Sequence, residues 1–211
     1  GILGLTALLQ DTVLNEEQLE YVTSANLCGQ SLLKIINDVL DFSKIEAGHM
    51  AIDTVDFNLL RVVEDVAEML AGKALDKGYE LVCSVNRDVP RWVQGDAGRL
   101  RQILTNLIGN AVKFSPTGAT VAVCVTEHDG MARIVVEDQG PGIPEDARES
   151  IFRKFVQLGG SNEREADGLG LGLAITKSIV EKHHGSVDFE SAQRGGTTFF
   201  IDLPKWDRSD S

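Results

Sequence analysis

The residues best suited to chemistry lie along one face of a helix predicted over residues 96–114. Five polar side chains spaced three or four residues apart share a narrow arc of this helix: Arg99, Gln102, Asn106, Asn110 and Lys113. A solvated helix face favours Glu, Lys and Arg, whereas two Asn residues one turn apart carry a cost in helix propensity. An Asn oxygen suits magnesium, a hard cation, and Lys113 can meet a phosphate oxygen. The face therefore predicts a site for a metal-bound phosphate.

A second candidate site follows a strand predicted to end at residue 137. Asp138 comes first, and Gly140, Gly142 and Ile143 follow it closely. Glycines let a flat ligand approach the backbone, and a carboxylate accepts a hydrogen bond from an exocyclic amine such as that of adenine. Considered alone, the segment is better explained as an ordinary turn that contains an Asp.

Two more glycine-rich segments precede a helix and a strand. The first alternates glycine with leucine: Gly168, Leu169, Gly170, Leu171 and Gly172. It opens a helix predicted to residue 183, where free backbone N–H groups attract anions. A Rossmann fingerprint needs a strand directly before the glycines and a P-loop needs a Gly-Lys-Ser/Thr sequence after them, so neither applies. The second segment, Gly195-Gly196-Thr197, is equally consistent with a tight turn.

These segments need a scaffold of interleaved helices and strands. Hydrophobic periodicity predicts helices over residues 2–9, 16–47, 59–75, 96–114 and 171–183. Strands are predicted over residues 51–57, 79–85, 120–126, 132–137, 186–190 and 197–203. The pattern indicates an α+β fold: a two-layer α/β sandwich with a mixed sheet and helices on one face, preceded by an α-helical hairpin. The long second helix has a one-sided apolar stripe, which predicts either a partner chain or packing on the rest of the domain.

Composition narrows the class of protein. The chain has 211 residues, 43% of them hydrophobic, and a formal net charge of -12. An acidic surface repels polyanions, so nucleic acid is not expected as a partner. Three widely spaced cysteines without a Cys-x-x-Cys pair suit a reducing compartment. No apolar run approaches the ~20 residues of a membrane helix. The abrupt, helix-like beginning predicts a piece of a longer protein.

In their order along the chain, these segments resemble the ATP-binding domain of histidine kinases, within the gyrase–chaperone–kinase–MutL superfamily. Residues 106–114 resemble the N-box of that family, and residues 151–155 resemble its F-box. Residues 138–142, 168–172 and 196–197 resemble its three glycine boxes. Residues 40–48 resemble the end of its dimerisation hairpin. The resemblance covers nearly the whole chain.

The resemblance implies ATP and magnesium as ligands. Asp138 would bind the adenine amine, Asn110 would hold the metal, Lys113 would contact phosphate, and Asn106 would line the metal and phosphate side. The remaining implied nucleotide contacts are Gly140, Gly142, Ile143, Phe155, Gly168, Leu169, Gly170, Leu171, Gly172 and Thr197. Residues 156–167 would form a mobile lid. The roles of Arg153, Lys154 and Arg164 stay open between phosphate contacts and solvated surface charges.

The resemblance also implies a role in two-component signalling. Residues 1–48 would be a truncated dimerisation and histidine-phosphotransfer hairpin, residues 49–205 the ATP-binding domain, and residues 206–211 a loose tail. The phosphate-accepting histidine of the family lies in a box resembling Ser-His-Glu-x-Arg-Thr-Pro. None of the four histidines, His49, His128, His183 and His184, has that context. The chain is therefore predicted to bind ATP without phosphorylating itself.

The expected partners follow from the same resemblance. The intact protein would form a homodimer through the hairpin and would phosphorylate the receiver domain of a response regulator. The chain is expected in the cytoplasm, and the parent protein can still be anchored to a membrane.

Three alternatives stay open at this point. One is an ATP-hydrolysing conformational switch of the same superfamily, in which a Glu at position 106 would activate water; Asn106 cannot take that proton. A second is a degenerate core that binds nucleotide only as a signalling scaffold. A third is a superfamily kinase that phosphorylates protein serine. An ATPase rate, a binding assay and the acid stability of the phosphoamino acid would separate them.

Overall fold

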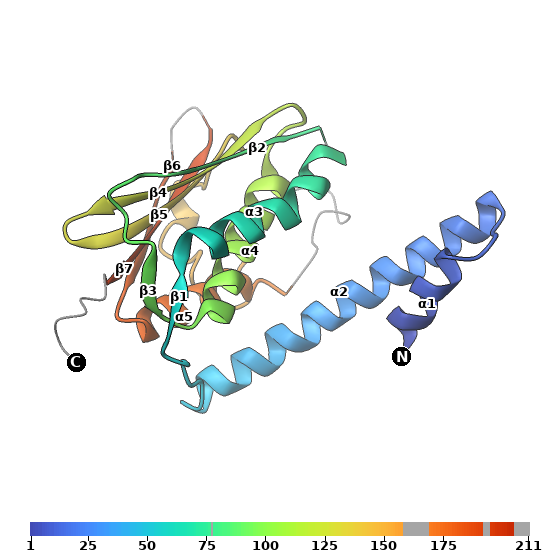
Figure 1. The fold of residues 1–211 in the computed structure, drawn as a ribbon, viewed down its shortest axis with the longest axis horizontal. Coiled ribbons are helices and arrows are strands. Elements are labelled where there is room, and N and C mark those ends of the chain that lie inside the picture. Colours follow the sequence, from blue (N-terminus) through green and yellow to red (C-terminus); the bar gives the residue numbers. More distant parts are fainter. Residues whose placement is uncertain (77, 158–168, 192–194, 205–211) are drawn as a thin grey trace.

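The computed structural model describes residues 1–76, 78–157, 169–191 and 195–204 (Figure 1). It begins with a helical hairpin of α1 (Ile2–Gln10) and α2 (Glu16–Glu46). Asn15 starts α2 through a capping box, because its side chain accepts from the Gln18 backbone N–H at 2.8 Å while the Gln18 side chain accepts from the Asn15 N–H at 3.1 Å. The hairpin predicted from the apolar pattern is confirmed.

Two sheets follow the hairpin. The larger one has the strand order β2 (Glu80–Val85), β4 (Thr120–His128), β5 (Met131–Asp138), β7 (Thr197–Pro204) and β6 (Ser186–Ser191). The β2–β4 pair is parallel and the other pairs are antiparallel, so the sheet is mixed as predicted. Asp129 and Gly130, both with positive φ, form the predicted hairpin turn between β4 and β5.

The smaller sheet pairs β1 (Val55–Asn58) with β3 (Trp92–Gly95). The strand predicted over residues 51–57 is wrong at its start, because residues 51–54 form no strand. The sequence analysis missed β3 altogether, because its four residues are too few to show a hydrophobic period.

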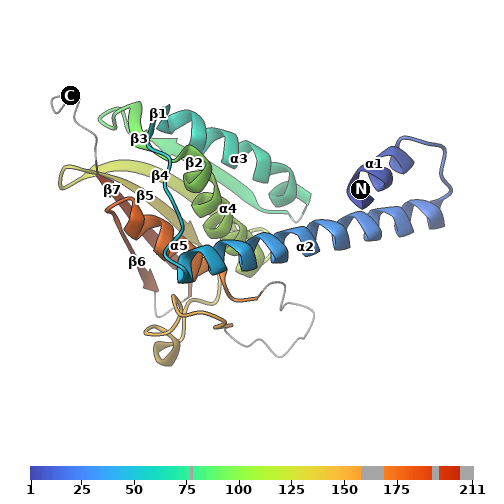
Figure 2. The ribbon, with the colours of Figure 1, turned by 90° about the horizontal axis from the view of Figure 1, so that it is seen from below.

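Three helices cover the larger sheet: α3 (Leu59–Asp76), α4 (Ala97–Phe114) and α5 (Gly172–Lys182). A short 3₁₀ helix, Glu145–Ala147, follows the Asp138 loop. Alternate strand residues such as Val123, Ile134 and Ile201 are fully buried and pack in one core with Leu104 of α4 and Ile179 of α5. Figures 1 and 2 show the helices on one face of the sheet. The predicted two-layer α/β sandwich is confirmed.

The apolar stripe of the hairpin does not pack on the rest of the chain for most of its length. Leu5, Leu32, Ile36 and Leu40 are 64%, 57%, 48% and 53% exposed. Figure 2 shows the first half of α2 extending away from the α/β module with only α1 beside it. Only the last turns of α2 reach the module, where Phe42 and Ile45 pack against the core. Within the described residues, no helix combines the length and apolar character needed to cross a membrane.

Candidate functional site

Asp138, the last residue of β5, lies opposite Thr197, the first residue of β7. Its Oδ1 atom accepts from the backbone N–H of Gly140 at 2.8 Å and from that of Thr197 at 3.2 Å. No described residue donates to its Oδ2 atom. Burial raises the pKa of Asp138, and the two backbone N–H groups lower it only in part. The structure thus holds one carboxylate oxygen in place and leaves the other available to a ligand.

The glycines around Asp138 are required by close backbone approach. A Cβ atom on Gly140 would lie 2.9 Å from Asp138 Oδ1 and 3.0 Å from the carbonyl oxygen of Phe114, the last residue of α4. The Gly196 N–H donates to the Gly140 carbonyl at 2.6 Å. These contacts bring the first and third glycine segments and the end of α4 together.

Ser191 also holds this loop, and the sequence analysis missed it. Its hydroxyl accepts from the Ile143 backbone N–H at 2.7 Å and donates to the Gly196 carbonyl at 3.3 Å. A serine at the end of a strand carries no signal in the sequence that distinguishes it from any other.

The polar face of α4 is divided between two partners. Arg99 Nη1 and Gln102 Nε2 each donate to Asp41 Oδ2 of α2 at 2.8 Å, and the Arg99–Asp41 pair is mostly buried. These two residues therefore bind the hairpin. The sequence analysis placed them on the same helix face as Asn106, Asn110 and Lys113 but gave them no contact with the nucleotide.

The other three polar residues of α4 lie nearer its C-terminal end. Asn106 is 8% exposed, and its Nδ2 donates to the carbonyl oxygen of Gly172, the first residue of α5, at 3.3 Å. Asn110 follows one turn later and is half-buried. Lys113 Nζ lies 5.1 Å from the centre of the Phe114 ring. Asn106 is thus brought to the glycine segment that opens α5.

Gly170 and Leu171 shape the start of α5. Gly170 has φ 68°, and a Cβ atom there would lie 2.6 Å from the Val156 carbonyl oxygen. Leu171 is the N-cap residue without a side-chain cap, and its side chain is buried, while Leu169 packs against the core. Gly168, Arg164 and residues 158–167 of the predicted lid lie outside the described residues.

Phe155 contacts the hairpin. It has φ 60° although it is not glycine, its N–H donates to the Gly170 carbonyl at 3.1 Å, and its ring meets that of Phe42 edge-to-face with centroids 5.9 Å apart. Lys154 forms an ion pair with Glu46 of α2 and lies 4.9 Å above the Phe42 ring. In this structure Lys154 therefore contacts the hairpin and Arg153 is exposed, and a phosphate contact by either residue stays a prediction.

His183 ends α5, as a capping role predicts. Its Nδ1 atom lies 2.8 Å from the Ile179 carbonyl, and its Nε2 atom accepts from the Asp96 backbone N–H at 3.2 Å. Asp96 is in turn the N-cap of α4, because its side chain accepts from the Arg99 N–H at 2.9 Å. His183 therefore joins the ends of α4 and α5 that lie away from the glycine segments.

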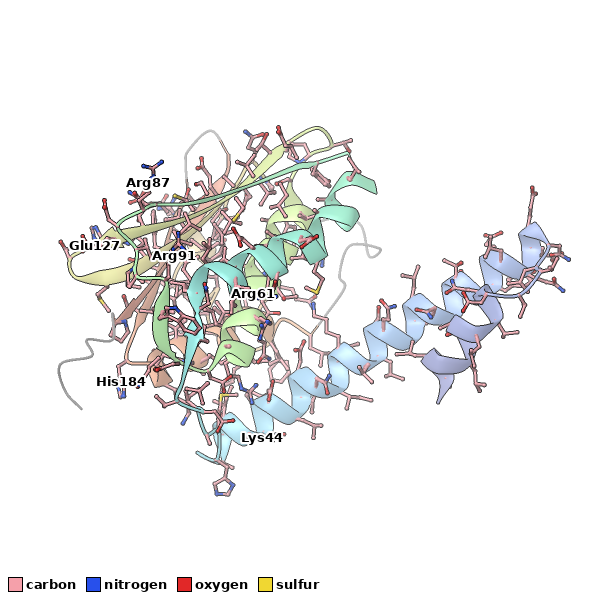
Figure 3. All side chains as sticks on the ribbon, in the orientation of Figure 1. Lys44, Arg61, Arg87, Arg91, Glu127 and His184 are labelled. Atoms are coloured by element: carbon pink, nitrogen blue, oxygen red, sulfur yellow. The ribbon has the colours of Figure 1, made fainter. Side chains whose placement is uncertain are left out.

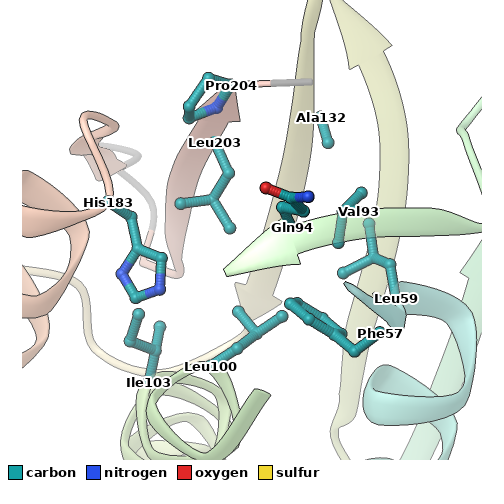
Figure 4. A pocket seen from close by; sticks show the side chains of 10 residues that line it. All are labelled: Phe57, Leu59, Val93, Gln94, Leu100, Ile103, Ala132, His183, Leu203 and Pro204. Carbon is teal, nitrogen blue, oxygen red and sulfur yellow. The ribbon is translucent and has the colours of Figure 1, made fainter. Parts of the chain in front are cut away.

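Hollows at two places along the described part of the sheet can be compared with the predicted site. A cavity of about 30 Å³ between β3, α4 and the end of β7 contains none of the predicted site residues (Figure 4), and it is far below the ~300–1,000 Å³ of small-molecule sites. A second hollow of about 660 Å³ is lined by Asp138, Gly195 and Gly196 among others. Neither hollow includes Asn106, Asn110 or Lys113. Within the described residues, no three His, Cys, Asp or Glu side chains form a metal cluster.

Comparison with known proteins identifies the family. Residues 95–207 match the family model described as histidine kinase-, DNA gyrase B-, and HSP90-like ATPase. Residues 1–48 match the His kinase A (phospho-acceptor) domain. The chain is 42% identical over 207 residues to sensor protein GacS of Pseudomonas syringae pv. syringae, which covers 96% of this chain and 23% of GacS. It is 37% identical over 207 residues to the histidine-protein kinase BarA of Escherichia coli K12. The match covers 96% of this chain and 22% of BarA.

Solved structures show the same likeness. Full-length ShkA in complex with AMPPNP superposes with a TM-score of 0.78 at 36% identity, covering 97% of this chain and 42% of ShkA. The mycobacterial sensor histidine kinase MprB superposes with a TM-score of 0.61 at 34% identity, covering 72% of this chain and 98% of that one. The chain thus spans about a quarter of the length of the curated relatives reported above.

Proposed function

The chain belongs to the histidine kinase family, and from this premise we propose that it is the ATP-binding catalytic core of a sensor histidine kinase. Such a core transfers the γ-phosphoryl group of ATP to a histidine in two-component signalling. Because the chain spans only 23% of GacS, the activity of the whole protein is part of the proposal. The observation that carries it is the Asp138 carboxylate, which the ends of β5 and β7 hold with one oxygen free.

The free Oδ2 atom of Asp138 would accept a hydrogen bond from the amino group of adenine. The ring would lie against the glycine backbone at Gly140 and Gly142, where no side chain intervenes. Thr197, which is 6% exposed, and Ile143 would complete this side of the pocket. A carboxylate selects an amine donor over a carbonyl acceptor, which favours adenine over guanine nucleotides.

The phosphates would extend from Asp138 toward the C-terminal half of α4 and the start of α5. Asn110 would hold magnesium through its amide oxygen, and phosphate and water would supply the other oxygen ligands. This ligand set needs no cluster of acidic side chains, and none is found among the described residues. Lys113 would neutralise a phosphate oxygen. Backbone N–H groups at the start of α5, an 11-residue helix, would add a favourable dipole.

Asn106 would line the pocket without acting as a base. Its amide donates to Gly172 and cannot take a proton from water, so rapid ATP hydrolysis is not expected. Phosphoryl transfer to an imidazole nitrogen depends chiefly on positioning and charge neutralisation. Since no histidine in this chain has the acceptor context, the chain alone would bind ATP without phosphorylating itself.

The hairpin supplies the proposed dimer interface. The exposed apolar residues of α1 and α2 need a partner, and two copies of the hairpin can bury them in a four-helix bundle. On this proposal residues 1–48 form the hairpin and residues 49–205 the ATP-binding domain, since α2 ends at Glu46 and Gly48 adopts φ 70°. The receiver domain of a response regulator would take the phosphoryl group next, in the cytoplasm.

Calorimetric titration with ATP and ADP, with and without magnesium, tests nucleotide binding. We expect magnesium-dependent binding of ATP. No binding would contradict the proposal and favour a scaffold that has kept the motifs without their use. Transfer needs a second assay, in which a version of the protein extended upstream through the acceptor box is incubated with labelled ATP. An acid-labile phosphohistidine is the expected product. An acid-stable phosphoserine or a rapid release of phosphate would support a rival activity instead.

A further inference from the structure

The two hairpin helices meet each other through small and polar residues. Thr6 is 8% exposed, and it alone is buried among the nine residues of α1, all of which the structure describes. Its hydroxyl accepts from Asn26 Nδ2 of α2 at 2.9 Å. One turn away, Leu3 lies over Gly29, where a Cβ atom would come within 2.7 Å of Leu3 Cδ2. We call these two pairings the inner contact of the hairpin. The proposed function uses the outer, apolar residues of the hairpin and assigns nothing to the inner contact.

The hydrogen bond between Thr6 and Asn26 belongs to a chain of hydrogen bonds. The Thr6 hydroxyl also donates to the Leu3 carbonyl at 3.1 Å, which leaves its lone pairs to accept from α2. Asn26 Oδ1 accepts from Gln30 Nε2 at 2.7 Å, one turn along α2. Polar groups that satisfy one another in this way hold a fixed geometry. Both partners of the bond between the helices are therefore also held by their own helices.

Apolar packing alone does not select which face of α1 meets α2. The apolar side chains of α1 surround its axis: Ile2, Leu3, Leu5, Ala7, Leu8 and Leu9. A rotation of α1 by one residue position, about 100°, would turn another apolar side chain toward α2. The polar side chains of α1 are Thr6 and Gln10, and Gln10 Nε2 donates to Thr23 Oγ1 of α2 at 3.4 Å. Hydrogen bonds therefore distinguish the observed face of α1 from the others.

The α/β module contacts α2 far from the inner contact of the hairpin. Asp41 accepts from Arg99 and Gln102 of α4, both at 2.8 Å. Figure 3 shows Lys44, three residues later, at the end of α2 that lies beside the module. Asp41 follows Asn26 by 15 residues, which is roughly 22 Å along a helix. The module contacts thus orient α2, whereas the inner contact orients α1 on α2.

The rotation of α1 also sets the direction of side chains on any upstream continuation of this helix. The residues of the inner contact pair in reverse order along the two helices, so α1 and α2 run antiparallel, and each turn upstream of Gly1 would reach further along α2. On the proposed function, the acceptor histidine belongs to this upstream stretch. Rotating α1 by about 100° would carry a side-chain end, ~5–6 Å from the helix axis, through roughly 8–9 Å. The inner contact therefore decides where such an imidazole points.

We propose that Thr6 and Asn26 are positioning residues for phosphoryl transfer, because their hydrogen bond sets the rotation of the helix that would carry the acceptor histidine. The inference rests on the proposed function, and neither residue would touch the nucleotide. A polar residue within an apolar helix contact specifies one packing arrangement at some cost in stability. A misplacement of reacting groups by about 1 Å can slow a reaction by roughly 100-fold. The pair should therefore govern the rate of transfer without changing ATP affinity.

The rotation of α1 can be measured in the chain as it stands. Because the Leu3 methyl groups lie close to Gly29, NMR spectra should show a nuclear Overhauser effect between the Leu3 methyl protons and the Gly29 α protons. Thr6→Val replaces the hydroxyl by a methyl group and should weaken this effect severalfold, whereas Thr6→Ser keeps the hydroxyl and should retain it. An undiminished effect in Thr6→Val would overturn the inference.

Transfer is measured in the version of the protein extended upstream through the acceptor box. We expect Thr6→Val and Asn26→Ala each to slow phosphohistidine formation at saturating ATP by about tenfold or more, with the Kd for ATP within about twofold. The double variant should be no slower than either single variant, because both remove the same hydrogen bond. Thr6→Ser should keep the rate. Thr12→Val is the matched control, because the Thr12 hydroxyl donates to the Leu9 carbonyl at 2.7 Å within its own turn of the chain.

The two assays separate this inference from the function on which it rests. If the unmodified extended protein forms no phosphohistidine, the proposed function fails and the inference falls with it. If that protein transfers phosphate and Thr6→Val does so at the same rate, the inference alone is overturned. Equal slowing by Thr12→Val would overturn it as well. So would a drop in helical circular dichroism or in sedimenting mass for Thr6→Val, because slower transfer would then report unfolding or dissociation of the hairpin.

Discussion

Replacing Asp138 by Asn isolates the contact on which nucleotide recognition is proposed to depend. The Asn oxygen can take over the hydrogen bonds from the Gly140 and Thr197 N–H groups, which now reach Oδ1 at 2.8 and 3.2 Å. The Asn amide nitrogen then replaces Oδ2 and presents N–H donors to the adenine amine, itself a donor. The substitution therefore removes one hydrogen bond and leaves the loop geometry intact.

The size of the effect follows from the charge of the acceptor. A hydrogen bond to a charged group contributes roughly 1.5–3 kcal/mol, and about 1.4 kcal/mol corresponds to a tenfold change in affinity. We expect the Kd for ATP to rise by roughly 10- to 150-fold. The folded state should not suffer, because burial raises the pKa of Asp138 and so opposes the ionised carboxylate that Asn replaces.

Glu137→Gln is the matched control for this substitution. Glu137 precedes Asp138 in β5, is exposed, and loses the same charge on conversion to its amide. Calorimetry should show ATP affinity close to that of the unmodified protein for Glu137→Gln and a large loss for Asp138→Asn. Equal affinities in the two variants would refute the assignment of Asp138, since the only difference between them is which carboxylate was removed.

Three further predictions concern the same module. Gly170→Ala should weaken ATP binding and lower stability, because Gly170 has φ 68° and the added methyl group would lie 2.6 Å from the Val156 carbonyl oxygen. The control is Gly109→Ala in the middle of α4, where an added methyl group meets nothing within 4 Å. This control should raise the free energy of unfolding in denaturant by up to ~1 kcal/mol. ATP affinity should fall as the pH drops through the raised pKa of Asp138, because protonation removes the charged acceptor, and Asp138→Asn should lack this dependence. Asp41→Ala should remove two hydrogen bonds and lower the free energy of unfolding by ~1–2 kcal/mol. It should also speed amide hydrogen exchange in the last turns of α2, whereas Asp11→Ala in the hairpin turn should leave that exchange unchanged.

The sequence predicted the elements whose signals are local. The helix over residues 96–114 has a strong apolar period, and the structure places its start one residue later, with Asp96 as the N-cap. The Asp129-Gly130 turn was predictable because both residues tolerate the positive φ that a two-residue hairpin requires. A close contact between the Gly140 backbone and another group was also predictable, because a glycine in a loop indicates a position without room for a side chain.

Contacts between distant segments were not predictable from spacing. Arg99 and Gln102 follow the same helical period as Asn106, but they bind Asp41, which lies about 60 residues earlier in the chain. Side-chain type and period fix which face of a helix a residue occupies, and they do not fix which partner covers each end of that face. The contact between the Phe155 and Phe42 rings was likewise not predicted, while the assignment of Phe155 to the nucleotide by motif position stays a prediction.

Because α4 is one continuous helix of 18 residues, its contacts form a single mechanical unit. Its first turns bind α2 through Arg99, its middle binds the start of α5 through Asn106, and its last residue contacts Gly140 beside the proposed adenine site. A helix held by i to i−4 hydrogen bonds transmits a displacement along its axis with little bending. One helix therefore carries the hairpin contact at its start and the residues proposed to hold phosphate and metal toward its end.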